Sequence, residues 1–312
     1  MNRKEITDWL IQSGWKPSMA ESVIKSGHID MSIDISEWKK TFVGAICSEH
    51  KNSAHIVRYL SQSIGKDIPQ WEDITAQSMR AVRNYMETCV TVNSARTYLA
   101  IIKATINLND KAGISGQQLK NAVKTKQMPV QNVSLSEEEL QLIHSYMPTS
   151  QTERDIKREF MIEAYCGARN SDVENLTERN VTDGKWLTYV SQKTKTKTCV
   201  PVHRNLMEYL RQGYGKKHSR KVIIETLQRI CKRVGITQPV EIFNRGEMRC
   251  LPKYKFVGSH TARRSFASQL ALRGIPLAVI SKFMGHSSPD MTMRYICIET
   301  ENISPDVQAF FN

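Results

Sequence analysis

The sequence contains no run of about 20 apolar residues, the length that a helix needs to cross a bilayer. Its first residues, MNRKEITDWLIQSGW, are amphipathic and lack the apolar stretch of a secretion signal. The seven cysteines stand singly, with no CxxC pair and no even count that would indicate a disulfide framework. These absences do not favour a membrane protein or a disulfide-stapled secreted domain. We therefore expect a cytoplasmic protein.

Acidic residues are too few to balance the basic ones. There are 31 Asp and Glu against 44 Lys and Arg, which gives a net charge of +13. Between Lys185 and Gly235 the sequence holds 13 Lys or Arg and only two acidic residues, Glu208 and Glu225. Such an excess favours a polyanionic partner, of which nucleic acid is the commonest, although a solvated basic face would give the same count.

A chain of 312 residues exceeds the size at which one hydrophobic core usually stops growing, so we expect two domains. Residues 1–125 read as helices. One helix is predicted within residues 73–86, capped by Thr75, with its apolar side chains at helical spacing: Met79, Val82, Tyr85 and Met86.

A second helix is predicted from about Ser94. Its basic face carries Arg96 and Lys103, which we expect to contact DNA. Its apolar face holds Tyr98, Leu99, Ile101, Ile102, Ile106 and Leu108.

The periodic pattern stops between Lys111 and Val133, where glycine, proline and lysine replace the large apolar residues. We place a linker near residues 120–133, with 126–133 as its defined range, and a second domain over 134–312. Directly after the linker, Ser136 and Glu139 fit a capping box and Leu135 with Leu140 fits a hydrophobic staple. A new helix is therefore expected to open the second domain.

The second domain is predicted to combine helices with one hairpin. Residues 160–176 read as a helix interrupted at Gly167, and helices return from about Lys221. Residues 186–202 read as a β-hairpin whose strands, WLTYVS and TCVPV, flank the lysine-rich turn QKTKTK. The expected fold class is mainly α with a small antiparallel β-sheet (α+β).

The densest group of reactive side chains lies near the C-terminus. His260 and Arg263, in SHTARRSFA, are three residues apart and would share one helix face, where both could reach a single phosphate. His286 follows in MGHSS, and Tyr295 lies nine residues beyond it. Taken singly, each histidine could be an ordinary core or cap residue, and the tyrosine a packed aromatic.

These motifs together resemble the tyrosine recombinase (phage integrase) family. HTARRSFA is similar to its His-x-x-Arg box, and MGHSSPDMTMRY to its Gly-His box with the nucleophilic tyrosine. CGARNSDVENL resembles its first arginine box, with Arg169 as the catalytic arginine and Asp172 as a supporting acid. Lys193, eight residues before Pro201, matches the catalytic lysine of its hairpin turn.

The resemblance implies a role for each residue in DNA cleavage. Arg169 and Arg263 would clamp the phosphate, because a planar guanidinium can meet two oxygens and stays charged at any working pH. Tyr295 would attack the phosphorus, His260 would take its proton, and Lys193 would protonate the leaving 5′-oxygen, with His286 completing the site. The product is a covalent 3′-phosphotyrosine link that conserves the bond energy, so no metal and no cofactor are expected.

Several of these positions also have plainer interpretations. Arg169 could make a surface salt bridge with Asp172 or Glu174. Lys195 and Lys197 compete with Lys193, and any of the three could be a generic phosphate contact, as could Arg264.

The resemblance covers about 134–300 firmly and 70–115 more loosely. It implies a helical, SAM-like core-binding domain over 1–125 and a catalytic domain over 134–312, which close on double-stranded DNA as a C-shaped clamp. Residues 1–35 match nothing in the family and are either a separate arm-site element or part of the clamp.

The family also implies a homotetramer on two duplexes and a monomer in the absence of DNA. The tail after Tyr295 is expected to pack on its own domain or to dock on a neighbouring protomer. Its apolar residues recur at roughly helical spacing: Ile303, Val307, Phe310 and Phe311.

The predicted function is site-specific DNA recombination. One alternative is a non-catalytic DNA-binding regulator, because residues 265–284 also fit a helix-turn-helix motif with Gly274 and Pro276 in its turn. Another is a type IB topoisomerase, which would relax DNA without site preference.

Overall fold

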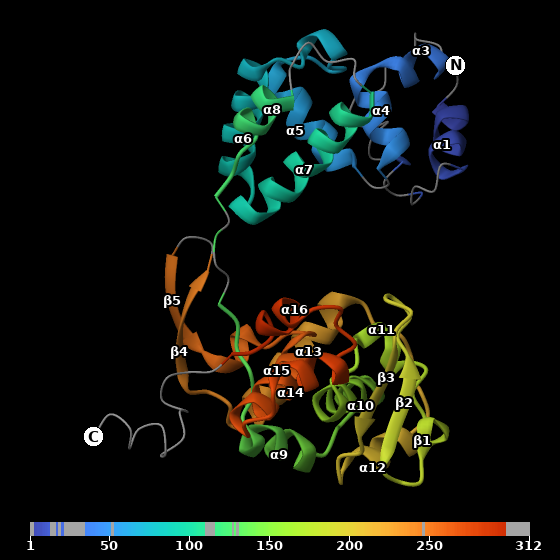
Figure 1. Cartoon of the computed structure of the whole chain (residues 1–312), viewed down its shortest axis with the longest axis vertical. Helices are drawn as coiled ribbons and strands as arrows, with labels where there is room; N and C mark the ends of the chain where they lie inside the picture. The colour runs from blue at the N-terminus through green and yellow to red at the C-terminus, as the bar shows by residue number, and fades with distance from the viewer. Residues whose placement is uncertain are drawn as a thin grey trace. The chain divides into compact units, whose positions relative to one another are not determined.

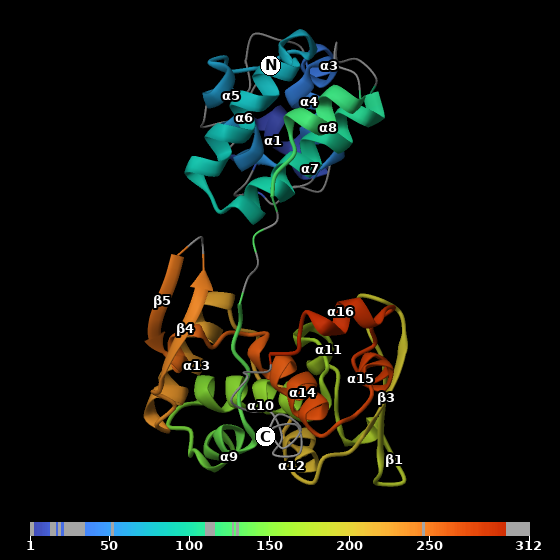
Figure 2. The same ribbon diagram turned by 60° about the vertical axis from the view of Figure 1, so that its left-hand side comes forward.

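The computed structural model describes residues 3–12, 17, 20–21, 35–50, 53–109, 116–126, 128, 131–244 and 247–297. The chain divides into two compact units, Met1–Pro129 and Val130–Asn312 (Figures 1 and 2). The described residues are mostly helical with two small antiparallel sheets, which confirms the predicted fold class.

The first unit is a bundle of helices around one hydrophobic core (Figure 1). Leu10 and Ala20 are fully buried in the same core as the later helices. The helices are α1 (Arg3–Gln12), α3 (Ile35–Lys40), α4 (Phe42–Glu49), α5 (Ala54–Ile64), α6 (Ala76–Cys89), α7 (Val92–Asn109) and α8 (Gly116–Ala122).

The start of α6 is as predicted, and so is its buried face except at Tyr85, which is half-buried. The Thr75 side chain accepts a hydrogen bond from the backbone N–H of Ser78 at 3.1 Å, and Met79, Val82 and Met86 are buried. This cap satisfies one of the N–H groups that the first turn of a helix leaves without an intrahelical partner.

Two details of the first unit differ from the prediction. Leu108, assigned to the apolar face of α7, is 71% exposed, because the helix has passed the edge of the core at its last turn. Helix α8 forms in the stretch predicted to be irregular, and its Leu119 and Ala122 are buried as it packs against α6. This helix has only 7 residues, too few for a helical spacing of apolar residues to be recognised in the sequence.

In the second unit the helices surround α10, which is buried along most of its length and packs against α12, α13 and α14. The predicted capping box is confirmed at α9, where Ser136 and Glu139 each bond the other's backbone N–H. The helices are α9 (Glu137–Ser145), α10 (Gln151–Cys166), α11 (Asn170–Val173), α12 (Leu206–Arg211), α13 (Arg220–Arg233), α14 (Thr261–Leu272), α15 (Leu277–Phe283) and α16 (Pro289–Met293).

A three-stranded antiparallel sheet contains the predicted hairpin. Its strands are β1 (Val181–Thr182), β2 (Trp186–Val190) and β3 (Lys197–Pro201), with Leu187 opposite Val200 and Tyr189 opposite Thr198. A second hairpin, β4 (Pro239–Asn244) and β5 (Glu247–Pro252), was not predicted. Because β5 is exposed along almost its whole length, it lacks the apolar alternation that reveals a half-buried strand.

In the part of the chain that the structure describes, no helix combines the length and the apolar character required to span a membrane.

Candidate active site

The end of α10 turns the chain so that Arg169 enters the site. Gly167 ends the helix in the left-handed conformation, at φ +68°, where glycine carries no steric penalty. A Cβ at this position would overlap the Phe266 ring of α14. The close approach of the two helices therefore requires glycine, and Arg169 follows as the N-cap residue of α11.

Arg169 and Asp172 meet through a buried serine and do not form the surface salt bridge considered above. Arg169 Nη1 donates to Ser191 Oγ at 3.0 Å, and Ser191 Oγ donates to Asp172 Oδ2 at 3.0 Å. Asp172 Oδ1 also accepts from the backbone N–H of Gln192 at 2.8 Å. The acid therefore supports the arginine and fixes the start of the lysine turn.

The lysine turn closes between Ser191 and Thr196, whose backbone N–H and C=O bond at 3.0 Å. Lys195 occupies the left-handed region at φ +54°. The side chains of Lys193, Lys195 and Lys197 are all exposed, so each is available to a phosphate.

Arg263 is the most deeply buried cation of the site, with 0% of its surface exposed. Its Nη1 donates to the carbonyl of Gly167, and its Nη2 donates to the carbonyl of Met284 at 2.5 Å. Its Nε is buried and has no hydrogen-bond partner among the described residues. Burial and the nearby Arg169 lower the pKa of the Arg263 guanidinium. Two fixed carbonyls thus hold the cation, and its Nε–H stays without a partner in the described part of the chain.

His286 lies beside this arginine, with its Nε2 2.8 Å from Arg263 Nη2. Burial, and then the charges of Arg263 and Arg169, lower the pKa of His286 to about 4, so the ring is neutral near pH 7. Gly285, just before it, has φ +60°, and a Cβ there would lie 2.7 Å from Thr198 Oγ1 of β3. The glycine lets this loop approach the sheet closely.

Tyr295 packs against both Arg263 and His286. Its ring centre lies 5.4 Å from Arg263 Cζ and 5.2 Å from the centre of the His286 ring. The segment after it is fixed, because the Cys297 N–H donates to Ser268 Oγ at 2.8 Å and the Cys297 carbonyl accepts from Ser134 Oγ at 3.0 Å. The structure therefore brings Arg169, Arg263, His286 and Tyr295 together.

His260 is the N-cap residue of α14 and its side chain is exposed, whereas Arg263, on the first turn of the same helix, is buried. Partial desolvation by the surrounding protein lowers the pKa of His260, and so do the charges of Arg264, Arg220, Arg263 and Lys193, in that order. His260 thus lies within electrostatic reach of both Arg263 and Lys193.

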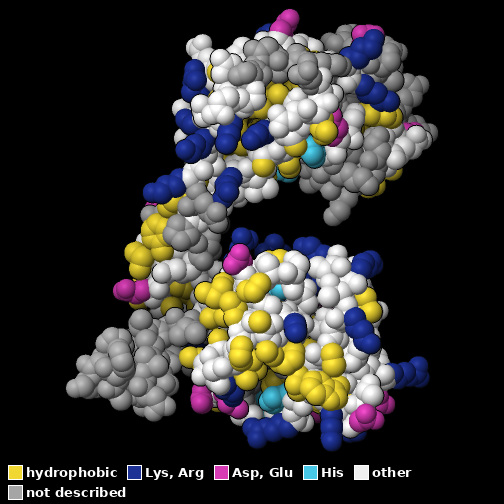
Figure 3. Space-filling model, in the orientation of Figure 1, with side chains coloured by type: hydrophobic (Ala, Val, Ile, Leu, Met, Phe, Trp, Pro, Cys, Tyr) yellow, Lys and Arg dark blue, Asp and Glu magenta, His cyan; other side chains and the backbone are white. Residues whose placement is uncertain are grey.

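The predicted DNA contacts lie on both units. Arg264 is partly buried, with Cys297 and Tyr295 among its electrostatic neighbours. On α7, Arg96 is exposed and Lys103 is partly buried. Figure 3 shows Lys and Arg side chains along the edge of the second unit where α16 and the β2–β3 turn lie.

Ser191 and Glu163 are among the groups near the site that sequence reasoning missed. Ser191 is buried because it continues the inward-facing set of β2, after Leu187 and Tyr189, and this alternation could have revealed it. Glu163 is buried in α10, with Oε1 accepting from Asn170 Nδ2 at 2.9 Å. Burial raises the pKa of Glu163 to about 8, partly offset by the Asn170 hydrogen bond and the Arg263 charge.

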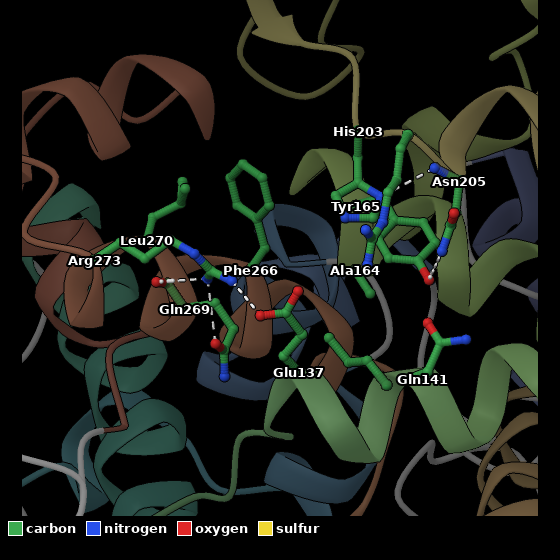
Figure 4. A pocket seen from close by; sticks show the side chains of 12 residues that line it. Glu137, Gln141, Ala164, Tyr165, His203, Asn205, Phe266, Gln269, Leu270 and Arg273 are labelled. Carbon is green, nitrogen blue, oxygen red and sulfur yellow. Dashed lines mark hydrogen bonds and ion pairs between the residues drawn. The ribbon is translucent and has the colours of Figure 1, made fainter.

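A separate pocket of about 220 Å³ lies between α9, α10 and α14 (Figure 4). Tyr165 and His203 stack on one side of it, with ring centres 4.1 Å apart, and Leu270 lines another side. An ion pair of Arg273 with Glu137, at 2.5 Å, lies at its edge. The pocket is mostly apolar.

Comparisons with known proteins place the chain in a family. The model described as the phage integrase family matches residues 133–301, more than half of the chain. The chain is 29% identical over 129 residues to the integrase of Haemophilus phage HP1, covering 41% of this chain and 33% of that protein. It is 31% identical over 144 residues to the tyrosine recombinase XerC of Thermodesulfovibrio yellowstonii, covering 41% of this chain and 44% of that protein. Each match thus spans less than half of the relative.

Solved structures share the fold at low sequence identity. The Tn1549 transposon integrase in complex with transposon right end DNA aligns with a TM-score of 0.58 and 13% identity, covering 87% of this chain and 99% of that one. A lambda integrase tetramer bound to a Holliday junction aligns with a TM-score of 0.55 and 18% identity, covering 86% and 79%. The family match contains all six residues assigned to the site, and the chain belongs to the phage integrase family.

Proposed function

We propose that this protein is a site-specific recombinase that cuts and rejoins double-stranded DNA through a 3′-phosphotyrosine link at Tyr295. The contact of the Tyr295 ring with the Arg263 guanidinium, at 5.4 Å, carries this proposal. It places a phenol beside a buried cation that still has a free N–H donor. A phosphate accepting that donor would lie within reach of the phenol oxygen once the ring turns aside.

The two arginines would supply the electrostatic part of catalysis. Negative charge gathers on the non-bridging oxygens as the phosphorus becomes five-coordinate, so preorganised cations stabilise the transition state more than the ground state. Arg263 is held by backbone carbonyls and Arg169 by Ser191 and the Gly285 carbonyl, so neither has to reorganise during the reaction. The pair is suited to clamp one phosphate.

Two further groups would move protons. A phenol with an ordinary pKa of about 10 is mostly protonated at neutral pH, so a neutral histidine nearby would assist attack. His260 is suited to this role because its environment lowers its pKa and keeps it unprotonated. Lys193, on the exposed turn, would protonate the departing 5′-oxygen.

A metal or nucleotide cofactor is not needed for this chemistry. The phosphotyrosine link conserves the energy of the broken phosphodiester, and a 5′-hydroxyl of the partner strand can reverse the step. The net positive charge of the chain suits the DNA partner, and we place the reaction in the cytoplasm.

We further propose that the protein assembles as a tetramer on two duplexes through its C-terminal tail. Residues 298–312 lie outside the described residues, and their apolar side chains include Phe310 and Phe311. The apolar pocket between α9, α10 and α14 is the proposed acceptor for the tail of a second copy. Figure 3 shows hydrophobic side chains gathered over α14 and α15, on this same unit.

Deleting residues 303–312 tests the tail. We expect binding to a single DNA site to persist and assembly on paired sites to be lost, with Leu270→Glu in the pocket failing at the same step. Undiminished tetramer formation by either variant would overturn this role.

The catalytic proposal is tested by trapping the protein covalently on nicked DNA from its own target region. A DNA-binding regulator forms no adduct on any duplex. A type IB topoisomerase forms one without site preference, whereas the recombinase forms it at defined positions. The helix-turn-helix segment of the regulator hypothesis corresponds to α14, which here bears Arg263, and α15, which packs against β3.

A further inference from the structure

A buried chain of hydroxyl groups leads from His286 away from the predicted active site. His286 Nδ1 lies 2.8 Å from Thr292 Oγ1, which lies 2.7 Å from Ser281 Oγ. Ser281 Oγ in turn donates to the backbone carbonyl of Leu277 at 2.8 Å. Thr292 is 0% exposed and Ser281 is 4% exposed, so water does not compete for these bonds.

The direction of each bond in this chain is fixed from both ends. Arg263 has only N–H groups, so His286 Nε2, 2.8 Å from Arg263 Nη2, has to accept and carries no proton. At the far end, the single proton of Ser281 goes to the Leu277 carbonyl. Thr292 therefore donates to Ser281 and accepts from His286. Both constraints require a neutral ring with its proton on Nδ1.

We propose that Thr292 is a positioning residue that holds His286 as the Nδ1–H tautomer, so that the Nε2 lone pair orients Arg263 in the phosphate clamp. This inference rests on the proposed function, since the clamp is part of it. Without the Thr292 hydroxyl, Nδ1–H would have no acceptor in this part of the fold, which destabilises that tautomer. Moving the proton to Nε2 would avoid this, but the His286 Nε2–H would then face an N–H of Arg263 Nη2, and the two donors could not bond each other.

The tautomer is measured directly on the full-length protein labelled with ¹⁵N only at histidine, without DNA. The sequence has eight histidines, and His286→Gln identifies the signals of His286. At neutral pH we expect its two nitrogens to show the coupling pattern of a neutral ring protonated on Nδ1. A ring protonated on Nε2, or on both nitrogens, overturns the proposal.

Three variants connect the tautomer to cleavage. Thr292→Val keeps the shape of the side chain without its hydroxyl, and we expect it to raise the Nε2–H population and to slow cleavage by about 10- to 100-fold, the usual cost of losing an orienting partner. Thr292→Ser restores the hydroxyl, and with it both the tautomer and the rate. Thr226→Val is the matched control, since it removes a buried hydroxyl of α13 outside the site and should change neither.

Failure of this proposal differs from failure of the proposed function. If wild-type protein forms no DNA adduct while His286 is protonated on Nδ1, the recombinase function is wrong and the hydroxyl chain stands. If Thr292→Val cleaves at the wild-type rate, or Thr292→Ser fails to restore the rate, the positioning role is wrong even though cleavage occurs.

Discussion

The guanidinium carbon of Arg263 lies 5.4 Å from the centre of the Tyr295 ring, although Arg263 lies in α14 and Tyr295 lies beyond the end of α16. Through this cation–π contact, the first turn of α14 packs against the segment that follows α16. The ring also covers the guanidinium, which is fully buried. If Arg263 binds the phosphate and Tyr295 attacks it, as proposed, this contact links the positions of the two groups before DNA binds.

The two arginines should respond differently to truncation. Arg169→Ala removes a partly exposed side chain, so we expect a folded protein that binds DNA but cleaves it at least about 100-fold more slowly. Arg263→Ala in addition leaves the carbonyls of Gly167 and Met284 unpaired, at about 1 to 3 kcal/mol each. Gel-shift binding, cleavage rates and urea unfolding separate these effects. Loss of binding with normal cleavage of the bound fraction would contradict the clamp role.

Lys193→Ala should slow cleavage by about 10²- to 10⁴-fold, because the 5′-oxygen then leaves without a proton donor. A substrate whose bridging 5′-oxygen is replaced by sulfur releases a thiolate, which needs no proton. We therefore expect sulfur to rescue Lys193→Ala but not Arg169→Ala. Lys195→Ala and Lys197→Ala are the matched controls on the same turn. If sulfur rescued Lys195→Ala instead, Lys195 and not Lys193 would be the proton donor to the leaving oxygen.

Gly167→Ala should destabilise the second unit more than Gly235→Ala does. Both glycines are left-handed, at φ +68° and φ +88°, so an alanine costs about 1 to 2 kcal/mol at either. Only at Gly167 does the new Cβ overlap Phe266, whereas nothing lies within 4 Å at Gly235. Overpacking adds about 1 to 3 kcal/mol. Equal urea midpoints for the two variants would show that α10 and α14 do not approach this closely.

Glu163 should make stability fall as the pH rises. Its pKa, raised from 4.5 to about 8 by burial, means that the folded protein holds a proton that the unfolded chain loses above pH 4.5. The protonated Glu163 side chain thus contributes fully to the free energy of unfolding below pH 4.5, and this contribution is lost as the pH rises through about 8. Glu163→Gln can still accept from Asn170 and does not titrate. Between about pH 5.5 and pH 8.5, the wild-type urea midpoint should drop relative to that of the variant. Parallel curves would mean that Glu163 is ionised throughout.

Much of the second unit could be predicted because its apolar residues recur at the spacing of a helix or a strand, or because a cap or turn residue marks where an element starts or stops. The alternation in β2 and β3 revealed their hairpin, and the Ser136 capping box revealed the start of α9. Gly167 was predicted to interrupt a helix over 160–176, whereas in the structure it ends α10, which begins earlier, at Gln151. The hairpin of β4 and β5 gave no such signal because its exposed side chains follow no apolar pattern.

The predicted site residues were recognised by their type and order, whereas their supports depend on tertiary contacts. The alternation of β2 indicates that Ser191 faces inward, but only the folded chain shows that it meets Arg169, and that Thr292 meets His286. The bond from Arg169 to the Gly285 carbonyl joins residues 116 positions apart, which no local pattern reports. The catalytic role of each residue stays a prediction until it is measured.

The most direct measurement is the identity of the residue that becomes linked to DNA. Wild-type protein is incubated with a nicked duplex containing its target site, so that the cleaved strand diffuses away and the adduct accumulates. Proteolysis and mass spectrometry should place the 3′-phosphate on Tyr295, and Tyr295→Phe should bind the duplex without forming an adduct. An adduct on another residue, or one that survives in Tyr295→Phe, would contradict the account.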